Sequence, residues 1–205
     1  MGDWGRLYVP EELVEVYRDV AVPAATVLTP NQFEIELLAG TGPLDSLEAA
    51  ARACDALHAR GPHTVVVTSM HAPGDRDDLL VFASTTRPQG PAPPRGGDGR
   101  VRRCTVRFRR LDAQFTGTGD LLSALLLAWL HKRPGDLEGA VTRAVATAQQ
   151  TVRSTMARAG RLAASVERSA EVCRARELRL VENIPSIVAP PVDDLDPPIE
   201  VSTFP

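Results

Sequence analysis

The 205-residue sequence lacks the features that mark several classes of protein. Only 4% of its residues are aromatic and its formal net charge is -3, so we expect no nucleic-acid partner, although residues 101–110 are locally basic. The three cysteines are widely spaced and form no CxxC pair, which predicts reduced thiols instead of disulfides or a zinc site. No apolar run reaches the roughly 18 residues of a membrane span, and residues 1–13 do not resemble a signal peptide. We therefore expect a cytoplasmic protein that does not enter a membrane.

What the sequence does contain is a succession of apolar segments with helical or strand periods. Hydrophobic residues make up 43% of the chain, enough for the core of one α/β domain. The spacing predicts helices over 11–22, 32–40, 44–61, 119–131 and 136–160. Strands are predicted over 26–31, 63–70, 77–85, 104–111 and 177–181.

The order of these elements predicts a mainly parallel sheet covered by helices on both sides, since strands and helices alternate. Within it, 104–111 alternates between apolar and charged residues, as a half-exposed edge strand would. The helix over 119–131 is so apolar that it should be largely buried. We expect residues 86–100 to form a flexible loop and 186–205 a proline-rich C-terminal tail.

The stretch FTGTGD, residues 115–120, leads from a predicted strand into the apolar helix. Backbone amides at the start of a helix have no intrahelical partners, and glycine lets an anion approach them closely, so this turn suits a phosphate group. Asp120 would repel that anion unless it takes part in the reaction, for example by accepting a proton from an attacking hydroxyl. The alternative is an ordinary helix start whose glycines permit a tight turn.

Two further polar segments follow predicted strands. Asn31 and Glu34 could contact a magnesium ion that bridges nucleotide phosphates, or they could simply form a capping box for the next helix. Thr68 and Ser69 could donate hydrogen bonds to a phosphate or merely end their strand. Ligands bind at the carboxyl ends of strands in open α/β sheets, which favours a shared site.

These segments resemble a known family. TPNQFE at 29–34, VVVTSM at 65–70 and FTGTGDLLSALLLAWLHK at 115–132 are similar to motifs of pyridoxal kinase, within the ribokinase-like superfamily. The resemblance begins at MGDWGRLYVPEEL and continues to ELRLV at 177–181, so it covers nearly the whole chain. It implies an incomplete three-layer ribokinase-like fold and phosphorylation of the 5′-hydroxyl of pyridoxal, pyridoxine or pyridoxamine by ATP. It also implies Mg²⁺ (or Zn²⁺), a monovalent cation (K⁺ or Na⁺) and a homodimer.

The resemblance assigns roles to individual residues. Asp120 would contact the substrate and act as the general base, while Gly117, Thr118 and Gly119 would stabilise the transferred phosphoryl group. Metal contacts would come from Asp3, Thr29, Glu34 and Thr68. The remaining nucleotide contacts would come from Asn31, Gln32, Phe33, Glu34, Thr68, Ser69, Leu111, Asp112, Ala113, Gln114, Phe115 and Thr116.

The sequence departs from the family at its start. About the first third of a pyridoxal kinase precedes the position that matches Met1, and that part supplies most of the vitamin pocket. We therefore expect impaired catalysis by this chain, because phosphoryl transfer depends mainly on positioning. The alternatives are an inactive nucleotide-binding remnant that acts through a partner, and a kinase for another ribokinase-like substrate.

Overall fold

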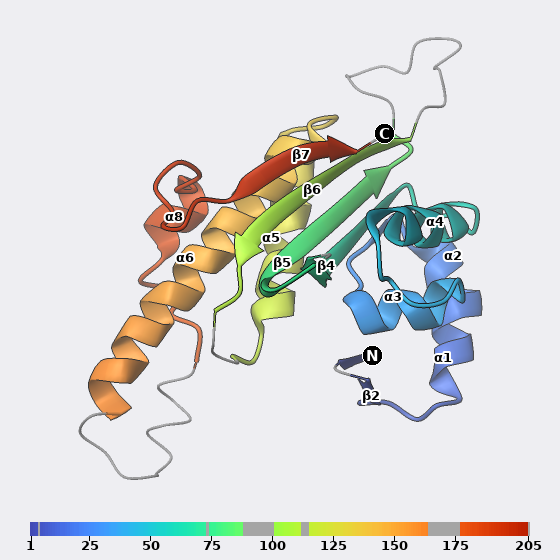
Figure 1. Cartoon of the computed structure of the whole chain (residues 1–205), viewed down its shortest axis with the longest axis horizontal. Coiled ribbons are helices and arrows are strands. Elements are labelled where there is room, and N and C mark those ends of the chain that lie inside the picture. The colour runs from blue at the N-terminus through green and yellow to red at the C-terminus, as the bar shows by residue number, and fades with distance from the viewer. Residues whose placement is uncertain (4, 73, 88–100, 112–114, 164–176, 205) are drawn as a thin grey trace.

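The chain forms three layers, with a five-stranded sheet between two groups of helices (Figure 1). The computed structural model describes residues 1–204 except 4, 73, 88–100, 112–114 and 164–176. The expected loop over 86–100 therefore lies almost entirely outside the described residues. In Figure 1 helices α3 and α4 lie on one side of the sheet, and α5 and α6 on the other.

The sheet has the strand order β3-β4-β5-β6-β7. Its strands are Val27–Leu28, Thr64–Ala72, Asp75–Thr85, Arg102–Arg109 and Glu200–Phe204. Only β3 and β4 are parallel, and the other three neighbouring pairs are antiparallel. The α/β class is confirmed, but the expectation of a mainly parallel sheet is wrong. The turn between β4 and β5 is too short for a parallel crossover, which needs about a dozen residues or more, and Gly74 at φ +79° makes it a hairpin.

The strand predicted over 104–111 is present as β6, but it is not an edge strand. The last strand, β7, forms within the proline-rich segment 186–205 and pairs with β6 along Arg103–Arg107. Alternation along a strand reports what its two faces contact, not whether its edges are paired, which explains the error. Residues 177–181, predicted as a strand, are irregular and end in a turn.

The five predicted helical segments are present, and one short helix, α8 (Ile184–Val188), was not predicted. After a short antiparallel pair, β1 (Gly2–Asp3) and β2 (Arg6–Leu7), the first helical segment comprises α1 (Leu13–Val16), η1 (Tyr17–Ala21) and α2 (Val22–Ala24). The others are α3 (Gln32–Ala39), α4 (Leu47–His58), α5 (Thr118–Lys132), α6 (Leu137–Ala163) and α8 (Ile184–Val188).

Local signals fix the ends of the two helices on one face. Helix α3 ends at Gly40, whose φ of +66° is readily adopted only by glycine. Helix α4 begins at Ser46, whose hydroxyl accepts a hydrogen bond from the amide of Ala49 at 3.1 Å. The sequence predicted Gly40 as the end of its helix and offered Asp45 or Ser46 as the cap of the next helix, and the structure has Ser46 in that role.

The sheet separates two apolar cores. On one face, α3 and α4 pack over β4 and β5 around Ile35, Leu57 and Phe82. On the other face, α5 and α6 pack over β4, β5 and β6 around Leu126 and Val141.

Helix α5 contributes only one face to its core. Leu122, Leu125 and Leu126 are buried, but Leu127 is 66% exposed, so the expectation that this helix is largely buried is wrong. A helix that packs on one side of a sheet leaves its opposite face outside the core. Across the described ranges, no helix combines the length and apolar character needed to cross a membrane.

Candidate functional site

Three consecutive residues after β3 connect the segments singled out in the sequence. The hydroxyl of Thr29 lies 3.0 Å from the hydroxyl of Ser123 on α5. The carbonyl oxygen of Pro30 accepts a hydrogen bond from the amide of Thr68 on β4 at 2.9 Å. The side-chain amide of Asn31 donates to the carbonyl oxygen of Gly2 at 2.7 Å. The tertiary structure therefore brings the 29–34, 68–69 and 117–120 segments to the same end of the sheet.

Thr68 and Ser69 lie at an irregularity in β4. The register against β5 shifts between Val67 and Met70, as in a β-bulge. A bulge re-aims side chains locally and is frequent beside active sites. The Thr68 hydroxyl donates a long bond of 3.4 Å to the Pro30 carbonyl oxygen, so it is directed toward the end of β3.

Asn31 and Glu34 form the capping box that the sequence offered as the simpler interpretation. The Asn31 side chain accepts from the Glu34 amide at 2.9 Å, and the Glu34 carboxylate accepts from the Asn31 amide at 3.1 Å. The second carboxylate oxygen of Glu34 accepts from the Met1 amino group at 2.8 Å and the Gly2 amide at 3.2 Å. Both carboxylate oxygens thus already have partners within the chain.

The other residues of this segment have structural contacts too. The Gln32 side-chain amide donates to the Leu44 carbonyl oxygen at 3.2 Å and accepts from the His71 amide at 3.2 Å, which ties α3 to its neighbours. A Cβ atom at Gly2 would lie 2.7 Å from the Phe33 ring, so β1 passes close over α3. Asp3 belongs to β1, but its side chain lies outside the described part of the structure.

The predicted phosphate turn begins α5. Gly117 has φ +90° and is the residue before the first helical turn, and its carbonyl oxygen accepts from the Leu121 amide at 2.9 Å. No side chain caps this helix start, although all of 115–120 is described. An added Cβ on Gly119 would meet nothing within 4 Å, and Asp120 is exposed. The turn therefore has the open space and uncapped amides that an anion requires.

The residues on either side of this turn are only partly described. Leu111 and Phe115 are half-buried and Thr116 is exposed, whereas Asp112, Ala113 and Gln114 lie outside the described residues. Leu178, from the 177–181 segment, comes within 3.9 Å of the Cβ position of Gly117. Residues 177–181 thus pack against the turn instead of adding a strand.

Sequence reasoning missed two residues of this region, Ser123 and Leu178. Ser123 interrupts the apolar run LLSALLL and follows Asp120 by three residues, which places both on one side of α5. A lone hydroxyl in such a run was an available signal. Leu178 carried no comparable signal, because its contact depends on how the end of the chain returns to α5.

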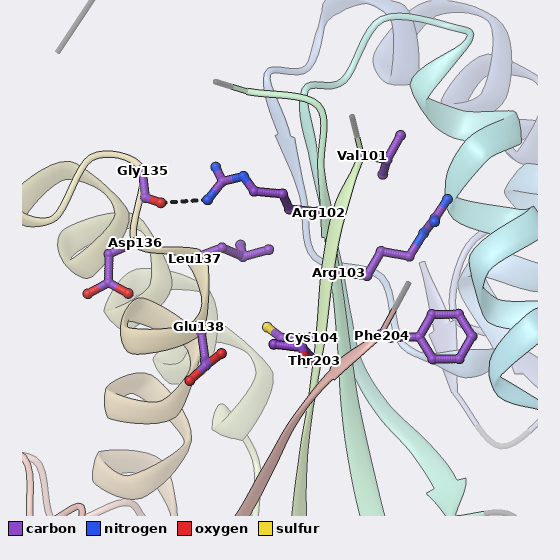
Figure 2. A pocket seen from close by; sticks show the side chains of 10 residues that line it. All are labelled: Val101, Arg102, Arg103, Cys104, Gly135, Asp136, Leu137, Glu138, Thr203 and Phe204. Atoms are coloured by element: carbon purple, nitrogen blue, oxygen red, sulfur yellow. Dashed lines mark hydrogen bonds between the residues drawn. The ribbon is translucent and has the colours of Figure 1, made fainter. Parts of the chain in front are cut away.

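One hollow among the described residues lies away from the turn that begins α5. It measures about 400 Å³ and lies between the start of β6, the end of β7 and the α5–α6 connection. Figure 2 shows Arg102 extending toward the carbonyl oxygen of Gly135, at 2.7 Å, while Arg103 extends away on the other side of β6. The glycine turn follows the opposite end of β6, so this hollow does not belong to the candidate site.

A second hollow lies near the other end of β6 and is strongly charged. It has a volume of about 280 Å³ and is lined by residues of β5, β6 and the segment before β7. Arg107 pairs there with Asp75 at 2.7 Å and with Asp78 at 2.6 Å. Hydrogen bonding to Asp78 raises the pKa of Arg107, so the guanidinium keeps its charge at neutral pH.

The described cysteines offer no nucleophile to the site. Burial raises the pKa of Cys54 and of Cys104 to about 12, so both are protonated thiols at neutral pH. The described residues also contain no group of three or more His, Cys, Asp or Glu side chains that could hold a metal ion.

Comparisons with known proteins concern the family and the fold of the chain. A family model described as phosphomethylpyrimidine kinase matches residues 3–91. Pyridoxal kinase from Homo sapiens is 42% identical over 161 residues, covering 76% of this chain and 50% of that protein. The Arabidopsis thaliana pyridoxal kinase is 45% identical over 156 residues, covering 76% of this chain and 47% of that protein. The structure of pyridoxal kinase from Leishmania donovani in complex with ADP and pyridoxine has a TM-score of 0.78 and 30% identity, covering 100% of this chain and 60% of that chain.

The layered fold and the glycine turn beside the ends of β3 and β4 define a chain of the ribokinase-like class. Within that class the similarity in sequence and structure is specific. The chain belongs to the pyridoxal kinase family and spans about half the length of the curated relatives it matches.

Proposed function

We propose that the chain is the nucleotide-binding and phosphoryl-transfer part of a pyridoxal kinase. It would transfer the γ-phosphoryl group of ATP to the 5′-hydroxyl of pyridoxal, pyridoxine or pyridoxamine. The observation that carries this proposal is the uncapped start of α5, with open space at Gly119 and an exposed Asp120. The related Leishmania donovani enzyme, which binds ADP and pyridoxine, supports both ligand classes.

The chemistry assigned to this turn is an in-line displacement. The amides of Thr118, Gly119 and Asp120 would donate to the transferred phosphoryl group, and the positive end of the helix would favour its negative charge. The Asp120 carboxylate would accept the proton of the 5′-hydroxyl as that oxygen attacks the γ-phosphorus. The bond from the γ-phosphorus to the bridging oxygen would break, and ADP would leave.

The proposed cations are Mg²⁺ (or Zn²⁺) and a monovalent K⁺ or Na⁺. Oxygen donors suit Mg²⁺, which proteins commonly hold through one or two carboxylates together with substrate phosphates. Glu34 would supply one such carboxylate and Asp3, as the resemblance implies, the other, and the hydroxyls of Thr29 and Thr68 would provide neutral oxygen donors for a monovalent ion. A metal would supply charge neutralisation on the phosphates.

A second candidate function is nucleotide binding without catalysis. The observation that favours it is the occupied carboxylate of Glu34, which accepts bonds from Asn31, Gly2 and Met1. A metal ion would have to displace some of these contacts. A third candidate, a kinase for another small alcohol, is supported by the match of residues 3–91 to the phosphomethylpyrimidine kinase family.

The experiment that separates these candidates uses the chain itself. Calorimetric titration with magnesium-ATP and then with pyridoxal measures binding, and transfer of labelled phosphate from ATP to pyridoxal measures catalysis. Binding without transfer would favour the non-catalytic candidate, and transfer only to hydroxymethylpyrimidine would favour the third.

Replacing Asp120 tests its role as the base. In a preparation that transfers phosphate, we expect Asp120→Asn to lower kcat by roughly 100- to 10,000-fold, the range for a lost general base. Magnesium-ATP affinity should remain nearly unchanged, because the amides are intact. Asp45→Asn, at an exposed aspartate between α3 and α4, is the matched control. Normal turnover by Asp120→Asn would refute the assignment.

We also propose a homodimer, as the family resemblance implies, and a cytoplasmic location. The exposed side chains Val16, Tyr17 and Val20 follow one side of the first helical segment and would suit a contact between subunits. Sedimentation equilibrium tests the dimer, and imaging of a tagged chain in its own cells tests the location.

A further inference from the structure

A hydrogen bond between the side chains of Ser123 and Thr29 joins α5 to the end of β3. Among the described residues, no other pair of side chains makes such a bond between these two segments. Their hydroxyl oxygens are 3.0 Å apart, although the residues are separated by 94 positions in sequence. Both residues are half-buried, which protects the bond partly from competition with water. The contact therefore links two elements whose relative position the sequence order does not fix.

The contact lies within one helical turn of the proposed base. Ser123 follows Asp120 by three residues, so their side chains emerge on the same side of α5. The opposite partner, Thr29, directly precedes the Pro30 carbonyl that holds Thr68 and the Asn31 cap of α3. The hydrogen bond thus ties the start of α5 to the point where β3, β4 and α3 meet.

Among the described residues, no other side-chain hydrogen bond fixes the start of α5. Within the described segment 115–120, α5 has no side-chain cap, and Gly117 adopts a left-handed conformation that fixes no side chain. The buried Leu122, Leu125 and Leu126 hold the helix against the sheet, but apolar packing is less directional than a hydrogen bond. A displacement of about 1 Å can lower a rate by as much as 100-fold, so the direction of this helix start matters.

We infer that Ser123 is a positioning residue, which acts through Thr29 to set where the glycine turn and Asp120 lie relative to the ends of β3 and β4. This inference rests on the proposed function for its catalytic consequence. The physical link between the two hydroxyls is independent of that function and can be measured without turnover.

The test compares Ser123→Ala, Thr29→Val and the double variant with the unchanged chain. Hydrogen exchange followed by mass spectrometry reports the amides of residues 121–124 in the first turns of α5. Loss of the bond should speed their exchange by roughly fivefold and lower the stability to urea correspondingly, since only the folded chain makes the contact. The double variant should match either single variant, because the same contact is lost in each.

Two further variants make the result specific. Ser123→Thr keeps the hydroxyl and should restore slow exchange, whereas Ser202→Ala, at an exposed serine on β7, should leave the 121–124 amides unaffected. Where phosphate transfer is measurable, Ser123→Ala should lower kcat by roughly 10-fold and leave KM for ATP unchanged, since the phosphate amides remain.

The outcomes separate this inference from the proposed function. Unchanged exchange at 121–124, or fully additive effects in the double variant, would overturn the link between Ser123 and Thr29. Faster exchange together with normal kcat would show that the link exists but does not position the base, which also overturns the inference. Absence of any phosphate transfer by the unchanged chain would count against the proposed function, while the exchange result would still decide whether the two hydroxyls fix the turn.

Discussion

Replacing the two glycines of the α5 turn by alanine should separate folding from phosphate binding. At Gly119 an added Cβ would meet no atom within 4 Å, and φ is not positive, so alanine fits without strain. Alanine is the better helix former by up to about 1 kcal/mol, so Gly119→Ala should keep or raise the free energy of unfolding. At Gly117, φ is +90°, and alanine there should cost about 1–2 kcal/mol.

Gly119→Ala should weaken the binding of magnesium-ATP even though it does not destabilise the fold. A methyl group at 119 would occupy the open space through which a phosphate approaches the amides. Loss of a hydrogen bond to a charged group costs about 1.5–3 kcal/mol, which is roughly 10- to 150-fold in Kd for magnesium-ATP. Gly119→Ala should therefore be a stable protein that binds nucleotide poorly.

Two measurements on each variant check this prediction. Urea denaturation gives the free energy of unfolding, and calorimetric titration with magnesium-ATP gives Kd. Gly160→Ala is the matched control, because Gly160 also lies in a helix, α6, with open space around its Cβ position. If Gly119→Ala binds magnesium-ATP like the unchanged chain, the phosphate does not bind at these amides.

Two other predictions concern α6 and the thiols. Partial burial opposes ionisation of Asp136, but hydrogen bonds from Arg133 and the Gly139 amide prevail and lower its pKa below 3.8. Asp136→Ala should lower the free energy of unfolding by about 1 kcal/mol near neutral pH. The difference in urea midpoint between this variant and the unchanged chain should shrink as pH falls from about 4 through the lower folded pKa of Asp136. A constant difference down to pH 2 would contradict this. With the third cysteine changed to serine, Cys54 and Cys104 should resist thiol reagents at pH 8 until urea unfolds the chain. The reason is that a pKa of about 12 in place of 9.0 lowers the thiolate fraction about a thousandfold. Rapid labelling of the folded chain would show that the two thiols are not buried.

Much of the candidate site was predictable from local sequence. The Gly40 helix end was predicted, and the Asn31–Glu34 capping box and the Ser46 cap were each one of two interpretations that the sequence offered, because each depends on contacts within a few residues. The start of α5 at the GTGD stretch was predicted for the same reason. The roles of these residues toward ATP, metal and vitamin remain proposals, since capping alone accounts for the contacts that Asn31 and Glu34 make.

Three errors concern how segments pair or pack with others. Strand β6 was expected at an edge, but β7 returns from the end of the chain to pair with it. The sheet was expected to be mainly parallel, although the short turn at Gly74 requires a hairpin. Residues 177–181 were expected as a strand, and instead Leu178 packs beside Gly117.

The sequence by itself determined the helices, most strands and the glycine turn, because backbone preference and apolar period act over a few neighbouring residues. Only the tertiary structure decided the strand order, the place of β7 and the meeting of Thr29 with Ser123. Those features depend on contacts between residues far apart in sequence, such as Thr29 with Ser123, 94 positions apart, and Thr105 with Ser202, 97 positions apart. No local pattern specifies such contacts, since they arise from the packing of the two apolar cores on either face of the sheet.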